Sequence, residues 1–342
     1  MFCMARRDGS NQVRMLDVAR EAGVSRATVS LVMRGDPVTA PHTREIVLAA
    51  AEKLGYVYDR RAAQLRSGQS NVVALIATDI RNPFFAEFAE AVEAPLKDHD
   101  KVMLVAFTHD DVEAQRMILR RLVEDRVTDI ILVPAIGTSA QEIRELSAGA
   151  DVVLATRRLT GADVAYVGTD DELGAAQVAE HLLGHGCRTV AFFGGKAASP
   201  TRQLRARSFA DAVRSGQATL VPSWHVPSEP SAVEGFRLAA QLIQQGPVPE
   251  GIACNSDPLA FGVLRALADA GIAIGREVRV TGFDDLAYSA LWRPSLSSVR
   301  VEPAILGQLA VTAVLGGEVR TYSHPPTLIA RESCGCVSAA TS

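Results

Sequence analysis

Residues 15–34, MLDVAREAGVSRATVSLVMR, have the residue spacing of a helix-turn-helix. Small Ala19 falls where two short helices crossing at ~90–120° must nearly touch. Gly23 suits the turn between them, since glycine adopts a positive φ without strain from a Cβ. Five apolar residues are spaced to pack this pair together and onto a third helix: Val18, Ala22, Val24, Val29 and Val32. A plain helical hairpin with a glycine turn is the alternative, but it does not require all of these positions.

The second helix of the pair is predicted to read double-stranded DNA. Ser25 is expected to N-cap it, leaving the outer face free to enter a major groove. Arg26, Ala27 and Ser30 are the expected base readers, and Leu31 is expected to make at most an apolar contact with a thymine methyl group. The full set of predicted DNA-binding residues here is Ser25, Arg26, Ala27, Thr28, Ser30, Leu31 and Arg34.

The charge distribution agrees with an N-terminal nucleic-acid module. The 342-residue chain has a net charge of −4. Residues 1–68 contain eleven Arg and Lys against seven acidic residues, so this part is basic and the remainder is acidic. A basic N-terminal part attached to an acidic remainder attracts DNA to the N-terminal part. A charged, solvent-exposed face with no DNA partner would give the same numbers of charged residues.

After the helix pair, Thr39 and Pro41 are expected to open a third helix that runs to Leu54 and ends at Gly55. Its expected apolar stripe consists of Ile46, Val47, Ala50 and Leu54. Residues 59–68, DRRAAQLRSG, form a basic segment too short to be a stable helix by itself.

From Asn71 onward, short apolar runs alternate with helical stretches. Runs such as VVALIA are apolar on both faces, as in strands buried within parallel sheets. About 260 residues of repeated βα units predict an α/β core of two doubly wound parallel-sheet lobes behind the all-α headpiece. Expected strands are 72–77, 102–107, 129–133, 151–155, 164–168, 189–193, 251–254, 278–282 and 326–330, and expected helices are 84–98, 111–125, 171–184, 203–214, 232–245, 258–270 and 303–315.

Ligands in such sheets bind beyond the carboxyl ends of the strands, so polar residues just after strands are the candidates. They form four pairs: Asp79 and Asn82, Asp170 and Asp171, Ser256 and Asp257, Asp284 and Asp285. Phe84 and Phe85 follow the first strand and could stack on an apolar ligand face.

The remaining patterns exclude several classes of function. No GxGxxG, HExxH or GxSxG motif occurs, and FFGGKAAS lacks the spacing of a phosphate-binding loop, so we expect neither an enzyme nor a cofactor. Cys187 and Cys254 are expected to be buried thiols. Cys334 and Cys336 lack zinc-type spacing and nearby histidine partners, and His181 and His185 are interpreted as exposed helix neighbours, so no metal is expected. With no signal-peptide pattern and no run of 18 apolar residues, a cytoplasmic protein without a membrane partner is expected.

The order of these parts resembles the lac repressor family of bacterial transcription regulators. The resemblance covers residues 13 to about 335 and rests on DVAREAGVSRATVS, TREIVLAAAEKLGY, AAQLRSG, NPFF, HLLGHGCRTVAFFGG, CNSDPLAFGVLRAL, VTGFDDLAYS and LIARESC. Some positions depart from the family's usual residues, and these departures leave the operator sequence and the effector open: Leu31, Asp59, Thr156, Ser208 and Ser256.

The resemblance implies a headpiece joined to a periplasmic-binding-protein-like core. The expected divisions are a tail at 1–12, the headpiece at 13–58, a hinge at 59–70, an effector-binding core at 71–336 and a tail at 337–342. Within the core, one lobe is expected at about 71–167 and 303–318, and the other at about 168–302 and 319–336.

The resemblance also implies roles for single residues. Leu65 would wedge into a minor-groove step beside Arg66, or instead pack against a second hinge. Arg205 would bind effector oxygens, although Arg202 or Arg207 could be the arginine that points inward. The implied effector site is Asn82, Phe84, Phe85, Arg205, Ser256, Asp257 and Asp284.

The expected protein is therefore a homodimeric repressor that binds a palindromic operator and a small-molecule effector, expected to be a sugar or sugar derivative. The alternatives are a co-repressor-dependent regulator that responds to a non-sugar metabolite, a solute-binding protein, or an α/β enzyme. A solute-binding protein would have no use for residues 13–58.

Overall fold

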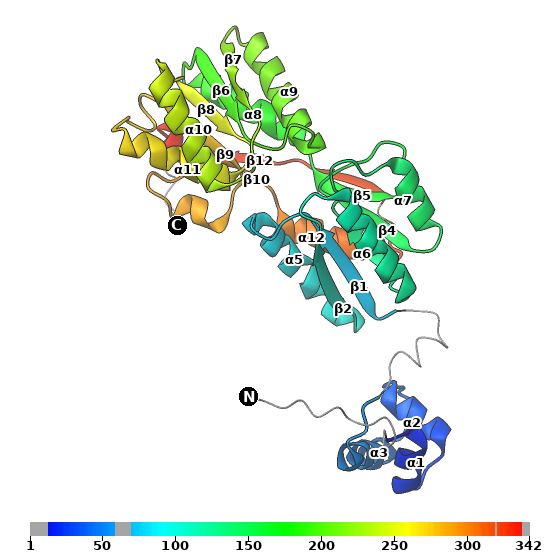
Figure 1. Ribbon diagram of the computed structural model, residues 1–342. Coiled ribbons are helices and arrows are strands. Elements are labelled where there is room, and N and C mark those ends of the chain that lie inside the picture. Colours follow the sequence, from blue (N-terminus) through cyan, green and yellow to red (C-terminus); the bar gives the residue numbers. More distant parts are fainter. Residues whose placement is uncertain (1–12, 59–69, 319, 337–342) are drawn as a thin grey trace, which may run out of the picture. The chain divides into compact units, whose positions relative to one another are not determined.

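The computed structural model describes residues 13–58, 70–318 and 320–336, and the chain divides into two compact units between Gln69 and Ser70 (Figure 1). The first unit contains three helices: α1 (Met15–Glu21), α2 (Arg26–Met33) and α3 (Pro41–Leu54). Gly23 has a φ of 65° in the turn between α1 and α2, as the spacing predicted.

The three helices of this unit share one small core. Val18, Val29 and Val47, one from each helix, are fully buried at its centre. The expected stripe of α3 is wrong at one position, because Ile46 is 40% exposed and Ala51 is buried instead. Residues four apart share a helix face, so Ala51 continues the row that Val47 begins.

The second unit begins with a six-stranded parallel sheet in the order β11-β5-β4-β3-β1-β2. Its strands are β1 (Val72–Ala77), β2 (Val102–Phe107), β3 (Asp129–Leu132), β4 (Asp151–Ala155), β5 (Ala165–Thr169) and β11 (Thr321–His324). Alternate residues of β1 enter two cores: Val73 and Leu75 on one face, Ala74 and Ile76 on the other. The first face is covered by α5 (Pro83–Leu96) and α12 (Pro303–Val314), and the second by α6 (Val112–Glu124) and α7 (Ala140–Ser147).

A second six-stranded sheet has the order β12-β10-β9-β8-β6-β7, and only β12 pairs antiparallel. Its strands are β6 (Thr189–Phe193), β7 (Thr219–Val226), β8 (Gly251–Cys254), β9 (Arg279–Asp284), β10 (Ser297–Arg300) and β12 (Thr327–Ile329). Its helices are α8 (Asp171–Gly184), α9 (Pro200–Ser215), α10 (Ala232–Gln245) and α11 (Asp257–Asp269), with short 3-10 turns elsewhere at η1 (Lys97–His99), η2 (Ala287–Ala290) and η3 (Glu332–Cys334). None of the helices in the described ranges is long and apolar enough to cross a membrane.

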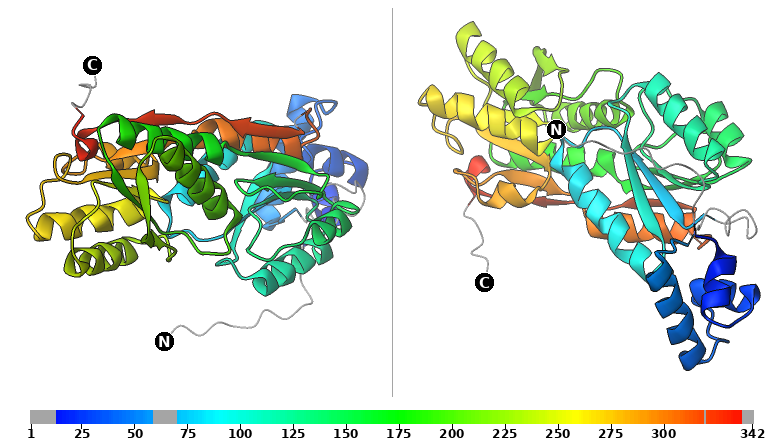
Figure 2. Two further views of the ribbon diagram at one scale, coloured as in Figure 1. Left: turned by 90° about the horizontal axis from the view of Figure 1, so that it is seen from above. Right: turned by 60° about the horizontal axis from the view of Figure 1, so that its bottom comes forward.

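The chain passes between the two lobes three times: from β5 to α8, from β10 to α12, and from β11 to β12 (Figure 2). The expected boundary of the second lobe at 319 is therefore misplaced, because β11 pairs with β5 in the first sheet. Likewise β5 ends at Thr169, two residues beyond the expected end of the first lobe at about 167. These boundaries depend on pairing between strands distant in sequence, which the local pattern does not contain.

Four helices and strands of the structure were not predicted from the sequence: α7, β7, β10 and β11. Strand β7 contains Pro222 and is half exposed at a sheet edge, so it has neither an apolar run nor clean alternation. Strands β10 and β11 read SSVR and TYSH, which are short and largely polar. Helix α7 has a complete capping box between Ser139 and Glu142, a signal that the sequence does contain.

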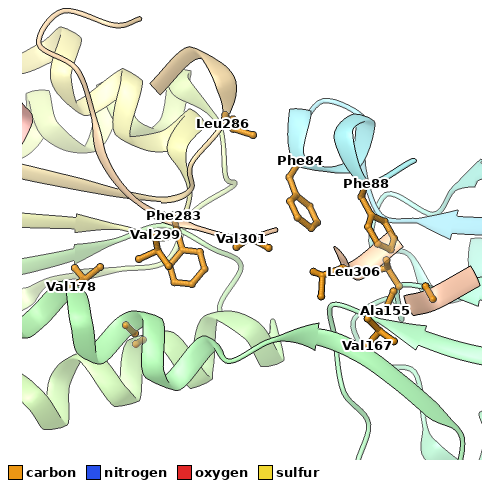
Figure 3. Close-up of a cluster of buried hydrophobic side chains, with 14 of the residues drawn as sticks. Phe84, Phe88, Ala155, Val167, Val178, Phe283, Leu286, Val299, Val301 and Leu306 are labelled. Carbon is orange, nitrogen blue, oxygen red and sulfur yellow. The ribbon is translucent and has the colours of Figure 1, made fainter. Parts of the chain in front are cut away.

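One apolar cluster continues from the first lobe into the second. It includes Phe84 and Phe88 on α5 and Phe283 and Val299 on the other side, and Figure 3 shows Val301 between these groups. The lobes are thus joined through packed side chains as well as through the three crossing segments.

Candidate functional site

A cavity of about 920 Å³ lies between the two lobes. The first lobe contributes Asn82, Phe84 and Phe85 to its lining, and the second contributes Arg205, Ser256 and Asp284. The cavity is therefore bounded by segments that follow the carboxyl ends of strands in both sheets, which is the usual ligand position in such folds.

Asn82, Phe84 and Phe85, at the start of α5, form the first-lobe wall of the cavity. The side chain of Asn82 accepts a hydrogen bond from the Phe84 backbone N–H at 3.2 Å and so caps the helix. The Phe84 ring is buried and stacks in parallel with Phe88, with centroids 6.1 Å apart. Phe85 is only half buried and meets Phe84 edge-on at 5.3 Å. Phe85 consequently offers more aromatic surface to the cavity, while Phe84 also belongs to the core.

Arg205 is held in one position by three neighbours. Its Nε donates to Asp171 Oδ1 at 2.7 Å, and its Nη1 donates to the Asn255 carbonyl oxygen at 2.7 Å. Its guanidinium carbon lies 3.4 Å from the centroid of the Phe283 ring. Among the three arginines considered from sequence, only Arg205 lines the cavity. Arg202 is buried and donates to a backbone carbonyl, and Arg207 is exposed.

Asp284 ends β9 at the cavity wall in an unusual environment. Its φ is 114°, a conformation that side-chain-bearing residues rarely adopt, and its Oδ2 has no hydrogen-bond partner among the described residues. Burial raises the pKa of Asp284 well above its ordinary value, while Arg205 and the Asn82 side chain favour the charged form. A buried carboxyl group with an unused oxygen is suited to hydrogen bonding with a ligand hydroxyl.

The next two candidates, Ser256 and Asp257, differ in placement. Ser256 lines the cavity, and its buried Oγ has no partner among the described residues. Asp257 is fully buried behind the wall, where its carboxylate accepts hydrogen bonds from the Leu286 N–H and the hydroxyls of Ser289 and Ser298. The expectation that Asp257 contacts the effector does not agree with this position, because its oxygens are already used to hold the β9–η2 loop.

The structure adds charged residues that sequence reasoning did not select. Arg157 forms an ion pair with Asp110, both from the first lobe, and Lys196 of the second lobe lies 3.9 Å from Asp110 Oδ2. Lys196 is also 3.5 Å from Glu229. These residues line the same cavity, and the ion pair between Lys196 and Asp110 joins the two lobes. No local spacing indicates this, because the residues come from separate strand ends.

An aromatic pair was also missed. The rings of Phe261 and Trp292 stack 4.6 Å apart at 26°, and both line the cavity. Asp171, the partner of Arg205, is one of the strand-end candidates predicted from sequence, although it is not in the effector site that the resemblance implies.

The candidate DNA-binding surface lies on α2. Ser25 accepts a hydrogen bond from the Thr28 backbone N–H at 3.1 Å, which confirms it as the N-cap. Ser25, Arg26, Ala27 and Arg34 are exposed, while Thr28, Ser30 and Leu31 are partly exposed. All seven side chains thus retain some surface, whereas Val29 and Val32 of the same helix are buried. Leu65 and Arg66 lie outside the described residues.

Comparison with known families matches two parts of the chain. Residues 14–59 match the model of the bacterial regulatory proteins of the lacI family, and residues 179–334 match a periplasmic binding protein-like domain.

Full-length relatives agree with these matches. The chain is 28% identical to the HTH-type transcriptional regulator GalS of Salmonella typhimurium, covering 94% of this chain and 96% of the relative. It is 30% identical to an HTH-type transcriptional regulator in the aml 5' region of Streptomyces limosus, covering 92% and 91%. It is also 27% identical to the ribose operon repressor of Haemophilus influenzae, covering 93% and 98%.

Solved structures show the same fold. The lac repressor dimer bound to operator and the anti-inducer ONPF superposes with a TM-score of 0.84 at 24% identity, covering 95% of this chain and 99% of that one. The complex of the transcriptional regulator CelR with cellobiose gives a TM-score of 0.69 at 23% identity, covering 94% and 99%.

Proposed function

Because this chain belongs to the lacI family of bacterial regulatory proteins, we propose that it is a homodimeric repressor of sugar-related genes whose operator affinity is controlled by a small polar effector. It is a DNA-binding transcriptional regulator by family. The operator, the effector and the residues that contact them are the finer parts of the proposal. A repressor acts where the DNA is, so we assign it to the cytoplasm.

The observation that carries the effector proposal is a pair of buried oxygens on one wall of the cavity, Asp284 Oδ2 and Ser256 Oγ, which have no hydrogen-bond partner within the described part of the chain. Leaving such groups without partners is costly, and ligand hydroxyls supply them. Arg205 and Asn82 add hydrogen-bonding groups, and Phe85 adds an aromatic face for the carbons of a sugar ring. This combination supports a sugar or sugar derivative bridging the lobes.

Sugar recognition also agrees with the printed names of relatives that act in sugar metabolism, such as the ribose operon repressor. Ser256 is a short side chain and leaves room for a bulky substituent or a bridging water. We assign no reaction to the cavity, so a bound sugar is expected to be released unchanged.

Exposed apolar residues on both lobes support a homodimer. Leu291 on the second lobe and Val102 on β2 of the first lobe are large apolar side chains left exposed in the single chain. A second copy would cover such surfaces on both lobes. A two-fold protein needs a two-fold DNA site, so the operator is proposed to be a near-palindrome.

The proposed mechanism couples the two sites through the lobes. An effector that bridges the cavity changes the angle between the lobes, and with it the arrangement of the two copies and their headpieces. Coupling of this kind is typically ~1–3 kcal/mol, a roughly 5–150-fold change in DNA affinity. An effector that lowers operator affinity is an inducer, and one that raises operator affinity is a co-repressor.

The function is tested by selecting binding sites from random DNA with the full chain and then titrating sugars into the complex. We expect a recurring near-palindrome, a dimer in sedimentation, and a log affinity that falls linearly with log salt. Asp284→Asn keeps the shape of the wall and should abolish the effect of the sugar while leaving effector-free operator affinity unchanged. No enriched sequence, or an unaltered sugar response in Asp284→Asn, would contradict the proposal or its site, respectively.

A further inference from the structure

Two histidines and a cysteine meet on the second lobe, on the C-terminal part of α8 and apart from the effector cavity. His181 lies in the last turn of α8 and His185 is the C-cap residue of that helix, so the two, four residues apart, lie on one face. Cys336 follows η3 and lies against them, with its Sγ 3.2 Å from His185 Nε2 and 3.8 Å from His181 Nε2. The candidate ligand atoms of the three residues all lie within 4.8 Å of one another.

This arrangement corrects two expectations from sequence. Cys336 does have histidine partners, although they precede it by about 150 residues, and the two histidines are half buried rather than exposed. The pairing depends on the C-terminal segment returning to α8, and no local spacing predicts this.

The distances match those of a metal site. Typical Zn–S and Zn–N bonds at a tetrahedral angle place the sulfur and nitrogen atoms roughly 3.6 Å apart. The two observed Sγ–Nε2 distances, 3.2 and 3.8 Å, lie on either side of this value. The two imidazole rings meet edge-on, with centroids 4.7 Å apart, and the Nε2 of each lies within 3.8 Å of the Cys336 sulfur.

We propose that His181, His185 and Cys336 form a zinc-binding site, with one further ligand from solvent completing the tetrahedron. Zn²⁺ takes mixed imidazole and thiolate ligands, and two histidines at i and i+4 on a helix are a recurrent zinc pair. On binding, the Cys336 thiol releases its proton to solvent and the thiolate sulfur bonds to the metal, while both histidines bind as neutral imidazoles.

The surrounding charges are compatible with this ligand set. The positive charge of Arg279 acts on both histidines and opposes a divalent cation. The negative charge of the Cys336 thiolate offsets it when the metal binds.

The bound metal would tie the C-terminal segment to α8. That helix begins with Asp171, which holds Arg205 at the effector cavity, so its two ends would both be fixed. We therefore expect bound zinc to stabilise the second lobe and to make the melting temperature depend on free zinc.

The test uses the reduced full-length chain with Co²⁺ alone and then Zn²⁺ alone. We expect one Co²⁺ per chain, a sulfur-to-cobalt charge-transfer band, visible bands of tetrahedral cobalt, and displacement of Co²⁺ by Zn²⁺. Cys336→Ser should abolish the charge-transfer band, and His181→Gln and His185→Gln should each weaken binding at least tenfold. Zinc should raise the melting temperature of the wild type but not of these variants.

Matched controls separate this site from other thiols. Cys254→Ser removes a buried thiol on β8 of the same lobe, Cys3→Ser removes the N-terminal one, and His99→Gln removes a histidine of the first lobe. All three should keep the band and the affinity. A band that persists in Cys336→Ser, or the absence of any cobalt bound by the wild type, would overturn the proposal and leave only a thiol–imidazole hydrogen bond. If Cys336→Ser folds poorly once a chelator has removed the metal, the cobalt affinity and zinc-dependent melting of His181→Gln and His185→Gln decide whether the site exists.

Discussion

Asp171 and Arg205 form a buried ion pair at the wall of the interlobe cavity, with Nε and Oδ1 2.7 Å apart. Both side chains are at least nine-tenths buried, and Arg205 is also held by the Asn255 carbonyl. The pair therefore positions the guanidinium group before any effector arrives, which lowers the cost of ordering it on binding.

This pairing predicts that Arg205→Ala is chiefly a stability mutation. Removing the guanidinium leaves a buried, unpaired carboxylate at Asp171, which typically costs about 3–5 kcal/mol. Denaturant unfolding of the core should show this loss. The double variant Arg205→Ala/Asp171→Asn should recover part of it, because no charge is then left buried. An Arg205→Ala protein as stable as the wild type would mean that the pair contributes little, and Asp284→Asn remains the cleaner test of effector binding.

A second prediction concerns pH. Burial raises the pKa of Asp257 from its ordinary value of 3.8 to about 7, while hydrogen bonds from Ser289, Ser298 and Leu286 oppose the shift. Between these two values the folded chain holds a proton that the unfolded chain has released. The contribution of Asp257 to stability therefore grows as pH falls from 7 toward 4, by at most about 1.4 kcal/mol per pH unit.

Asp257→Asn should flatten this dependence, since an amide does not titrate. Its oxygen can accept from the Leu286 N–H and the Ser289 hydroxyl, while its NH2 group donates to the Ser298 hydroxyl, whose bond is thereby reversed. Thermal unfolding of both proteins from pH 7 to pH 4 measures the difference. Carboxylates whose pKa is lowered in the folded chain, such as Glu142 with a pKa of about 2, act in the opposite direction in both proteins. The difference between the two curves therefore isolates Asp257, and parallel curves would refute the assignment.

The sequence predicted the parts of the fold that local patterns encode. The helix-turn-helix and the strands of the sheet centres were identified because Gly23, Ser25 and runs such as VVALIA each have a local physical reason. Strands β10 and β11 were missed because their polar residues are ordered by pairing with strands distant in sequence, β10 with β9 and β12, and β11 with β5. The third passage between the lobes was misplaced for the same reason.

The candidate site shows the same division. Asn82, Arg205 and Asp284 could be chosen because strand ends and the family resemblance indicated them, and all three line the cavity. The approach of Lys196 to Asp110 could not be predicted, since it depends on how the two lobes face each other. Asp257 shows the opposite error: it occupies a strand-end position but is turned into the protein.

A third prediction concerns base recognition by α2. Leu31 is partly exposed on the face that carries Arg26 and Ser30. Leu31→Arg should shift the preferred base at one position in each half-site, because arginine donates two hydrogen bonds to guanine where leucine offers only apolar contact. Selection from random DNA measures the profile. Leu48→Arg adds the same charge to the exposed surface of α3 and should leave the profile unchanged. If Leu31→Arg also selects the wild-type sequence, Leu31 is not part of the recognition surface.

The last prediction concerns the hinge, where Leu65 is proposed on sequence grounds to wedge into a minor-groove step. A wedge acts only in the bent, specific complex, and unstacking a step costs a few kcal/mol that the extra contacts offset. Leu65→Ala should therefore weaken operator binding by at least tenfold and reduce DNA bending, while binding to random DNA and thermal stability stay near wild type. Leu65→Met keeps an apolar wedge and should retain most of the affinity.

Arg66→Ala should instead weaken binding to operator and to random DNA alike and lower the salt dependence of binding, as expected for a phosphate contact. Binding assays with bent and unbent operator fragments separate these outcomes, and an equal loss on random DNA for Leu65→Ala would assign the residue to packing between hinges.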